Sequence, residues 1–466
     1  MGSDFLKGNG SSISLIMRKG MKTEQQPLIS IVMPLYNAEM FLDEAICCVL
    51  SQTFNNFELI CIIDGCTDRT EIIVRKYATI DKRVKILIND CKKGAAYSRN
   101  VGIKIAKGRY VAFLDGDDIF DEHMLELAIG AALENRTDLI LFDAVHSDTE
   151  HIHKKRRSSR TDRYLEKYCR TPFSLNENNE IELASQYSTS PCNKLYNLEF
   201  IKNNHIYFQD LKNSNDVYFT ELNMILSRRT IHLYSEYVLV YARDHKSQSR
   251  ISFNRDPMCA YLAYKKLIEE TKERNLLKKN SRYILLRSYI GIANAISSIK
   301  DEKEKSDFLL FLKKNGIDNI LELLRDIDID ADIIELLNVY KSNSGLAINY
   351  YNLFVEKYIC NKHLNNILNL FNNGNKVVMW GCGTYGNIII RLLEENNISF
   401  MDVVDANESI IGNSIGKYRI KYAFSYDFSK ADCVLVSTKG ISRNVRNELK
   451  QCHNLLIVDF CDLVKI

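Results

Sequence analysis

The chain has 466 residues, of which 46% are hydrophobic and 26% are charged. These values are typical of a globular protein, and the length predicts about two or three domains. The 62 basic and 59 acidic residues leave a formal net charge of +3, which creates no overall field for nucleic acid, so we expect no nucleic-acid partner.

The thirteen cysteines are scattered along the chain and form no C-x-x-C pairs at zinc-site spacing. This pattern indicates thiols that stay reduced rather than a disulfide framework, and it predicts a cytoplasmic location. No apolar run reaches the roughly 18 residues of a membrane-spanning helix, and the start of the chain lacks the layout of a signal peptide. We therefore expect any membrane contact to be peripheral, at the inner face of the membrane.

The first predicted elements alternate between strand and helix. Residues 1–27, rich in Gly, Ser and Lys, are expected to be a disordered leader, with Met21 as an alternative start. The apolar run 28–37, LISIVMPLYN, is typical of a central parallel strand that opens into a loop. Residues 38–53 repeat apolar side chains at helical spacing, with acids near the N-terminal end, where the helix dipole favours them.

The alternation continues through the next hundred residues. A strand at 57–63 ends at the polar turn DGCTD, and a helix and a strand at 84–88 follow. A helix at 94–106 leads to the strand YVAFL at 110–114, and DLILFD at 138–143 adds a further strand. Strands alternating with helices, with carboxylates at the strand ends, predict an open α/β sheet whose ligand lies beyond its carboxyl edge.

Three carboxylates follow the strand YVAFL directly, in the sequence Asp115-Gly116-Asp117-Asp118. Gly116 lets the backbone turn so that Asp115 and Asp117 converge on one point. Two converging carboxylates repel each other unless a cation neutralises them, and Mg²⁺ or Mn²⁺ is the natural occupant of such a site. A lone D-x-D is more often an ordinary polar turn, so the surrounding motifs decide the interpretation.

Several motifs at matching spacing resemble those of the family 2 glycosyltransferases, which have the GT-A fold, over about residues 28–250. The family's P-x-Y-N is present as residues 34–37, and its D-D-G-S-T-D as residues 63–68, with departures at Ile63 and Cys66. The family's G-x-x-x-x-R-N-x-G, A-x-G-x-Y and F-L-D-x-D-D are matched by residues 94–118.

The resemblance implies a nucleotide-sugar donor site. Asp64 would accept a hydrogen bond from an imide N–H of the nucleotide base. Pro34, Tyr36 and Asn37 would line the same pocket. Asp64 also fits the structural role of a turn or cap residue.

The resemblance also assigns the charged residues near the diphosphate. Arg99 would orient the acidic cluster or contact the nucleotide, although a helix-face ion pair is an alternative. Asp117 would bind the Mn²⁺ or Mg²⁺ ion that holds the diphosphate. Asp115 would hold the ribose or a metal-bound water, and it is a second candidate metal ligand.

A second group of motifs predicts the catalytic base. Residues 190–201, SPCNKLYNLEFI, resemble the family's W-N-K-L-F segment, with Cys192 where an aromatic residue is often found. The segment KNSNDVYF resembles the family's E-D element, with Asn215 in place of the glutamate and Asp216 as the aspartate. Asp216 would take the proton of the acceptor hydroxyl. A helix N-cap is the structural alternative for Asp216, and the two roles can coexist.

Two polar segments have weaker signals. Residues 241–252 resemble an Arg/His-x-x-x-Ser segment, in which Arg243 or His245 would steady the departing diphosphate; a solvated loop is an equal alternative. The basic run 151–163 fits anionic lipid headgroups or a phosphate-bearing acceptor, although such runs are more often solvated loops.

The second half of the chain predicts helices and then a small α/β domain. Residues 255–373 have a helical period and are interpreted as a connector with an acceptor or oligomer surface. Residues 374–466 contain a strand, the turn Gly381-Cys-Gly383-Thr-Tyr-Gly386, a helix and a second strand that ends at Asp405. This segment resembles the nucleotide-sugar-binding Rossmann-like modules of sugar-modifying enzymes, but it is short for the two halves that bind a dinucleotide.

The predicted fold class is therefore α/β, with a leader at 1–27, a GT-A catalytic domain at 28–254, a helical region at 255–373 and a Rossmann-like domain at 374–466. The predicted function is an inverting, metal-dependent glycosyltransferase that moves a sugar from a UDP-sugar donor to a hydroxyl of a glycan or lipid-linked glycan in bacterial surface polysaccharide assembly. The alternatives are an NAD-dependent enzyme that acts on nucleotide sugars through its C-terminal domain, and an inactive binding module.

Overall fold

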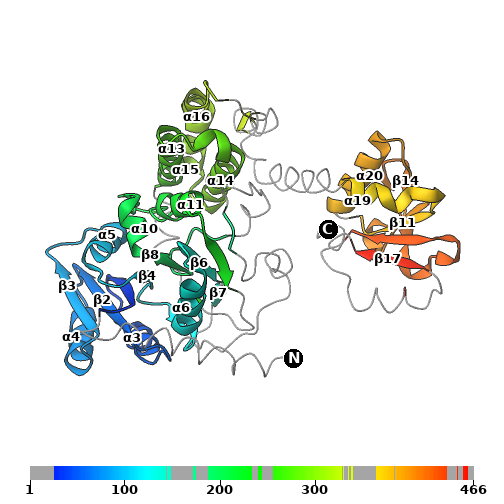
Figure 1. Ribbon diagram of the computed structural model, residues 1–466. Helices are drawn as coiled ribbons and strands as arrows, with labels where there is room; N and C mark the ends of the chain where they lie inside the picture. Colours follow the sequence, from blue (N-terminus) through cyan, green and yellow to red (C-terminus); the bar gives the residue numbers. More distant parts are fainter. Residues whose placement is uncertain are drawn as a thin grey trace. The chain divides into compact units, whose positions relative to one another are not determined.

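The computed structural model in Figure 1 divides the chain into two compact units, Met1–Ser344 and Gly345–Ile466. The structure describes residues 26–142, 144–147, 172–174, 187–233, 240–243, 256–327, 329, 334, 337–338, 364–382, 384–437, 449 and 455–459. The predicted leader up to residue 25, the basic run 151–163, His245 and Gly383 lie outside these residues. The predicted domain limits stay predictions.

The first unit is built on a seven-stranded sheet with the order β3-β2-β1-β4-β8-β6-β9. The strands are β1 (Ile29–Leu35), β2 (Phe57–Asp64), β3 (Val84–Asn89), β4 (Tyr110–Phe113), β6 (Leu139–Phe142), β8 (Lys194–Asn197) and β9 (Thr230–Leu233). Neighbouring strands are parallel except for β8, which is antiparallel to both β4 and β6. The inner strands read as continuous apolar runs because both of their faces are buried.

Helices cover both faces of this sheet (Figure 1). They are α3 (Leu42–Leu50), α4 (Thr70–Ile80), α5 (Ala95–Ile105) and α6 (Met124–Asn135). A Cβ at Gly102 of α5 would lie 2.3 Å from the Val32 side chain, so only glycine lets α5 approach β1 this closely. The first helix begins four residues later than the predicted residue 38, because the backbone N–H groups of Ala38 and Glu39 donate to the side chains of Thr70 and Asp68 instead.

A small second sheet of three strands borders this region. It has the order β5-β10-β7, formed by β5 (Ile119–Phe120), β10 (Val240–Arg243) and β7 (Ala144–Ser147). Two short helices follow β8 in the chain: α10 (Leu198–Asn203) and α11 (Val217–Leu226). An aromatic cluster fixes α11 against the sheet, since Phe219 of α11 stacks on Phe208 at 3.9 Å between ring centroids and packs edge-on against Phe113 of β4.

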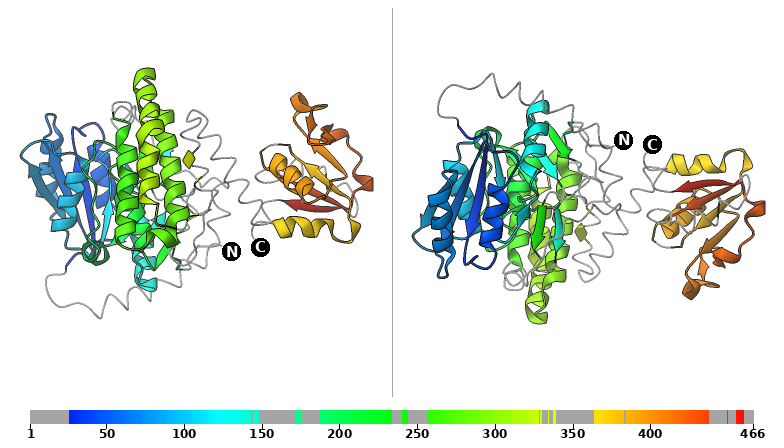
Figure 2. Two further views of the ribbon diagram at one scale, coloured as in Figure 1. Left: turned by 90° about the horizontal axis from the view of Figure 1, so that it is seen from above. Right: turned by 90° about the horizontal axis from the view of Figure 1, so that it is seen from below.

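The part of the predicted helical region that lies in the first unit packs against α11. It consists of α13 (Met258–Glu273), α14 (Leu277–Ser298), α15 (Glu302–Phe311), the π-helical turn Leu312–Gly316 and α16 (Ile317–Leu323). Figure 2 shows these helices side by side, next to the α/β sheet. A Cβ at Gly291 of α14 would lie 1.9 Å from the Tyr264 ring of α13, so glycine permits the close packing of these two helices.

A buried ion pair joins α14 to α11. Arg287 of α14 donates from Nε to Glu221 Oε1 of α11 at 2.7 Å, and the Tyr283 hydroxyl donates to Glu221 Oε2 at 2.6 Å. The Glu221 and Arg287 side chains are only 3% and 8% exposed. Because both carboxylate oxygens are paired, the charge of Glu221 is compensated away from water.

The second unit has a five-stranded parallel sheet with the order β15-β12-β11-β16-β17. Its elements are α19 (Leu364–Leu368), a 3₁₀ turn (Asn369–Gly374), β11 (Val377–Trp380), α20 (Thr384–Glu395), β12 (Asp402–Asp405), β15 (Lys421–Tyr422), β16 (Cys433–Val436) and β17 (Leu456–Asp459), with a small hairpin of β13 (Ser414–Ile415) and β14 (Tyr418–Arg419). This order corresponds to strands 3-2-1-4-5 of the doubly wound dinucleotide fold.

Close backbone packing and internal hydrogen bonds hold the glycine turn of the second unit in place. Gly381 has φ = 106°, and a Cβ at Gly386 would lie 2.1 Å from the Gly381 carbonyl oxygen. The Ser437 hydroxyl donates to that same carbonyl at 2.7 Å. Both carboxylate oxygens of Asp405 accept backbone N–H groups, from Cys382 at 2.6 Å and from Asn407 at 2.8 Å. Asp405, at the end of the second predicted strand of this segment, therefore has structural partners in this fold.

Two chain-wide expectations concern thiols and membranes. The nine cysteines in the described segments are all free thiols. In the same segments, no helix is both long enough and apolar enough to cross a membrane.

We predict that Glu221→Gln lowers the free energy of unfolding of the first unit by about 3 kcal/mol or more, because it leaves the Arg287 charge buried without its counter-ion. Urea unfolding followed by near-UV circular dichroism measures the change. Glu71→Gln is the matched control, because Glu71 forms an exposed ion pair with Arg75 and we expect an effect below about 1 kcal/mol. Equal effects in the two variants would show that the α11–α14 pair contributes no more than a surface pair.

Candidate active site

The carboxyl ends of β1, β2 and β4 meet at one edge of the sheet, because these strands are parallel neighbours. Asp64 is the last residue of β2, and the loops that follow β1 and β4 carry Asn37 and Asp115. In an open α/β sheet this edge is where ligands bind. The fold therefore gathers three of the predicted site residues at one edge, although they are far apart in the sequence.

Asp64 is buried and holds the loop that leads into α5. Its Oδ1 accepts Asn89 Nδ2 and the backbone N–H of Lys93, both at 2.8 Å, and its Oδ2 accepts the backbone N–H of Gly94 at 2.7 Å. Gly94 has φ = 94°, a backbone conformation that favours glycine. Asp64 thus anchors a segment 30 residues away rather than capping its own turn.

The loops after β1 and β2 are tied to each other through Asn37. Its side-chain oxygen accepts the backbone N–H of Thr67 at 2.8 Å, and Asn37 itself has φ = 47°. The Cys66 thiol donates to the Leu35 carbonyl at 3.3 Å and accepts the Asn37 N–H at 3.4 Å. Cys66 can therefore take the place of the serine in the family motif, because a thiol supplies the same donor and acceptor in weaker form.

The other two predicted pocket residues are Pro34 and Tyr36. Pro34 lies within β1, opposite Ile62 of β2. The ammonium group of Lys92 lies 3.4 Å from the centroid of the Tyr36 ring. This cation–π contact places a positive charge at the predicted donor pocket, and the sequence analysis did not identify it.

Arg99 of α5 connects the two predicted halves of the site. Its Nη2 lies 2.7 Å from Asp115 Oδ1, and its Nη1 donates to Asn215 Oδ1 at 3.3 Å across 116 residues of sequence. The Arg99 side chain is 7% exposed, so it is not a surface ion pair. Burial lowers the pKa of Arg99, but its acidic neighbours, of which Asp115 acts most strongly, together outweigh burial, so the pKa of Arg99 is held above its ordinary value.

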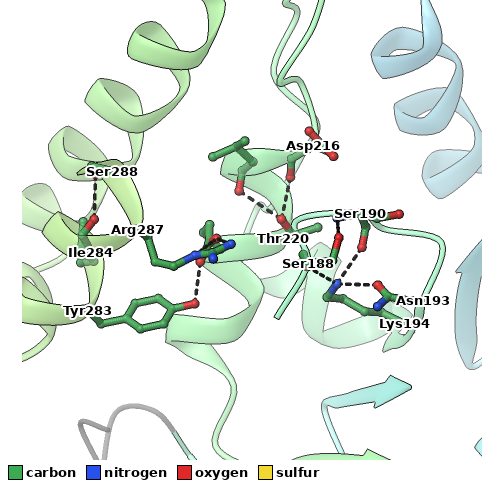
Figure 3. A network of polar contacts seen from close by, with 12 residues as sticks. Ser188, Ser190, Asn193, Lys194, Asp216, Thr220, Tyr283, Ile284, Arg287 and Ser288 are labelled. Atoms are coloured by element: carbon green, nitrogen blue, oxygen red, sulfur yellow. Dashed lines mark hydrogen bonds and ion pairs between the residues drawn. The ribbon is translucent and has the colours of Figure 1, made fainter. Parts of the chain in front are cut away.

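Asp216 lies at the N-cap position of α11 but makes no side-chain capping hydrogen bond. Its backbone carbonyl accepts the Thr220 hydroxyl at 2.9 Å, and Figure 3 shows its carboxylate turned away from Thr220. Burial raises the pKa of Asp216, while Arg99 and then Lys194 oppose that rise. Asp216 therefore combines a stronger than usual basicity with two nearby cations that favour its ionised form.

Lys194 of β8 is a buried cation that the sequence analysis did not identify as a site residue. Its Nζ donates to the Ser190 carbonyl at 2.6 Å, the Ser188 carbonyl at 2.7 Å and Asn193 Oδ1 at 2.8 Å (Figure 3). Burial lowers the pKa of Lys194 to about 7. Three acceptors require three N–H groups, which only the ammonium form has, so the geometry favours the charged state. Lys194 occupies the lysine position of the W-N-K-L-F segment, and this match was the feature of the sequence that could have indicated it as a site residue.

Asp115, Asp118 and Cys192 each place one potential ligand atom within 4.8 Å of the others. Asp117 is not part of this group, so its predicted role as a metal ligand stays a prediction. The two carboxylates fit a hard divalent cation. Burial raises the pKa of the Cys192 thiol well above its ordinary value, which makes it a poor ligand for Mg²⁺ or Mn²⁺. The third acid of F-L-D-x-D-D, Asp118, was therefore a candidate that the sequence analysis overlooked.

The structure describes the backbone of one of the two diphosphate-binding candidates, Arg243. The backbone of Arg243 ends β10, beside Ser147 of β7. His245 lies outside the described residues. Their predicted contact with the diphosphate stays a prediction.

Comparison with known proteins identifies the first part of the chain. Residues 30–202 match the family model described as glycosyl transferase family 2. The chain is 44% identical over 108 residues to the UDP-Glc:alpha-D-GlcNAc-diphosphoundecaprenol beta-1,3-glucosyltransferase WfgD of Escherichia coli, which covers 23% of this chain and 42% of that protein. It is 37% identical over 112 residues to the putative teichuronic acid biosynthesis glycosyltransferase TuaG of Bacillus subtilis, covering 24% of this chain and 44% of that protein.

A solved structure shares the fold over a longer stretch. The structure of Staphylococcus aureus TarS 1–349 in complex with UDP-GlcNAc is similar with a TM-score of 0.54 and 22% identity, over 71% of this chain and 91% of that chain. At this identity the likeness shows the fold alone. The chain spans less than half the length of the two curated relatives above.

The resemblance inferred from the motifs is therefore confirmed: residues 30–202 match glycosyl transferase family 2, on a GT-A-type α/β fold.

We predict that Asp115→Asn weakens Mn²⁺ binding by about tenfold or more, which is the scale seen when groups that merely orient metal ligands are removed. The reason is that Asp115 belongs both to the predicted D-x-D pair and to the carboxylate pair that the fold brings together. Electron paramagnetic resonance of free Mn²⁺ measures the affinity. Glu126→Gln is the control, since Glu126 is an exposed acid that accepts the Thr53 hydroxyl and lies 3.8 Å from the His123 imidazole. Unchanged Mn²⁺ affinity in Asp115→Asn would remove Asp115 from the metal site.

Proposed function

We propose that this protein is an inverting, metal-dependent glycosyltransferase that moves a sugar from a UDP-sugar to a hydroxyl of a glycan or lipid-linked glycan in bacterial surface polysaccharide assembly. The observation that carries the proposal is the Arg99 bridge, which brings Asp115 of the donor motif next to Asn215 and Asp216 of the base motif. WfgD is named as a transferase from UDP-Glc to a diphosphoundecaprenol-linked sugar, and TuaG is named for teichuronic acid biosynthesis. TarS, which shares the fold, was solved with UDP-GlcNAc.

The donor would lie over the carboxyl ends of β1, β2 and β4. Asp64, with Pro34, Tyr36 and Asn37, would bound the pocket for the base, and Arg99 would face the diphosphate. A Mn²⁺ or Mg²⁺ ion would be held by Asp115 with Asp117 or Asp118, and when bound it would offset the charge that develops on the leaving diphosphate. Arg243 and His245 are retained as further candidates for diphosphate contact.

Asp216 would act as the general base. It accepts the proton of the acceptor hydroxyl while the acceptor oxygen forms its bond to the anomeric carbon. The bond between that carbon and the diphosphate oxygen breaks on the opposite side, which inverts the configuration and releases UDP. Burial makes the carboxylate a stronger base, and the charges of Arg99 and Lys194 keep it ionised before the proton arrives.

The second unit gives two observations in favour of the NAD-dependent alternative. Its strand order matches five strands of the doubly wound dinucleotide fold, and its glycine turn follows β11, the first of these strands. Against this, both Asp405 oxygens already accept backbone N–H groups, and Ser437 donates into the turn at Gly381. We therefore keep the transferase as the proposed activity. A cytoplasmic location, peripheral membrane contact and oligomer formation stay predictions.

We predict that Asp216→Asn keeps UDP-sugar binding but lowers the turnover number of transfer by about 10²-fold or more, the usual scale for a general base. Calorimetry measures donor binding, and UDP release in the presence of acceptor measures turnover. Asn215→Asp is a useful comparison, because it restores a carboxylate at the position where the family has glutamate. Loss of donor binding in Asp216→Asn, with no separate loss of turnover, would assign Asp216 a structural role.

We predict that the acid side of the pH profile of transfer reports the ionisation of Asp216. Transfer falls as the pH drops through the Asp216 pKa, because the protonated carboxyl cannot accept a proton. Arg99 lowers that pKa, so Arg99→Gln raises it and moves the acid limb of kcat/KM to higher pH. Arg83→Gln, which removes a cation paired with Asp81 instead, leaves the limb in place. If the acid limb of kcat/KM in Arg99→Gln is unchanged or moves to lower pH, its assignment to Asp216 is wrong.

A further inference from the structure

A cavity of about 540 Å³ lies beside the N-terminal end of α11, between that helix, the segment 187–189 and helices α13 and α14. Its volume is in the range that small-molecule sites occupy. None of the donor motifs contributes to its wall. Helices α13 and α14, from the region that the sequence predicts to be a connector with an acceptor or oligomer surface, form most of its described wall.

The cavity opens next to the base. Ser214 and Val217, which lie in its wall, flank Asp216 in the chain. Tyr264 forms another part of the wall, and burial raises the pKa of its hydroxyl, with Asp216 among the charges that add to the rise. The carbonyl of Ser188, which also lines the cavity, accepts a hydrogen bond from the Lys194 ammonium group at 2.7 Å. A molecule in this cavity would therefore lie near the Asp216 carboxylate, against a wall whose backbone is held in place.

The lining suits a neutral molecule with many hydroxyl groups. Hydroxyls of serine and threonine, the Asn294 amide and the rings of Tyr187 and Tyr264 alternate with small apolar side chains. Among the described residues of the wall, Arg287 is the only one with a charged side chain, and Glu221 already pairs with it. A phosphate group would find no uncompensated cation among these lining residues. A sugar ring would find hydrogen-bonding groups for its hydroxyls and aromatic rings for its apolar face.

We propose that this cavity binds the accepting saccharide as a neutral sugar ring and presents one of its hydroxyls to Asp216. The inference rests on the proposed function and specifies the substrate class of its second site. The helical region thereby becomes the part of the protein that selects the acceptor.

The end of α14 offers a matched pair of positions for a test. Ser297 and Ser298 are both exposed, and both donate their hydroxyl to the Asn294 carbonyl at 2.8 Å. Only Ser298 lines the cavity. Ser298→Trp therefore places an indole at the cavity, whereas Ser297→Trp makes the same change, with loss of the same hydrogen bond, outside it.

Saturation-transfer NMR on the full chain with UDP and Mg²⁺ measures binding of three probes: methyl glucoside, methyl galactoside and methyl N-acetylglucosaminide. We expect at least one to bind the parent and Ser297→Trp equally and to bind Ser298→Trp about tenfold more weakly, a difference that competition titrations resolve. Equal binding to both variants, or no glycoside binding to the parent, would overturn the inference. Binding of sn-glycerol 3-phosphate at the cavity in place of the glycosides would also overturn it, because it would identify an anionic acceptor.

UDP binding measured in the same samples separates the two proposals. If the parent binds UDP but no glycoside, only the acceptor site is wrong. If it binds no UDP, the proposed function itself is wrong.

Discussion

The buried guanidinium of Arg99 is the contact on which the candidate site depends. It lies on α5, at the carboxyl edge of the sheet, and it joins Asp115 after β4 to Asn215 just before α11. Asp115 and Asp216 would otherwise repel each other, and burial alone would favour the protonated form of Asp216. Arg99 reduces both the repulsion between the two acids and the cost of burying the Asp216 charge, because one cation interacts with both carboxylates. The GT-A sheet and the N-terminal end of α11, where the proposed base lies, are therefore coupled through a single charged side chain.

Further paired charges extend this arrangement into the helical region. Five residues after Asp216, Glu221 pairs with Arg287 of α14, and Lys194 of β8 lies close enough to Asp216 to lower its pKa. Each of these charges would be costly in isolation, but each has an opposite charge or a full set of hydrogen-bond acceptors. Arg287, which positions α11 through its ion pair with Glu221, also lines the cavity beside Asp216. Stability of the helical region and geometry of the proposed base are thus linked by the same residues.

The sequence predicted the parts of the fold that local patterns determine. The strands at 57–63, 84–88 and 110–114 and the helix at 94–106 were found because a central parallel strand is a continuous apolar run and a covering helix repeats every three to four residues. Carboxylates at the ends of these strands then had to meet at one edge. The family motifs supplied Asp216 as the proposed base, which no periodicity could have indicated.

The missed features all depend on contacts between distant segments. The antiparallel insertion of β8 between β4 and β6 has no local signature, because a four-residue strand reads alike in either direction. Lys194 looked like an ordinary lysine, since its burial comes from the loop at 188–193 folding over it. The partners of Asp64 lie about 30 residues further along the chain, and the packing of α13 and α14 onto α11 joins segments that are separated by tens of residues.

The central claim is that the nucleotide binds at the sheet edge of the first unit. The most direct test is a crystal structure of the full chain grown with UDP and Mn²⁺. The account predicts the uracil beside Asp64, the diphosphate facing Arg99, and the ion bound to Asp115. UDP bound instead at the glycine turn of Gly381 in the second unit, with the edge near Asp64 and Asp115 empty, would contradict it.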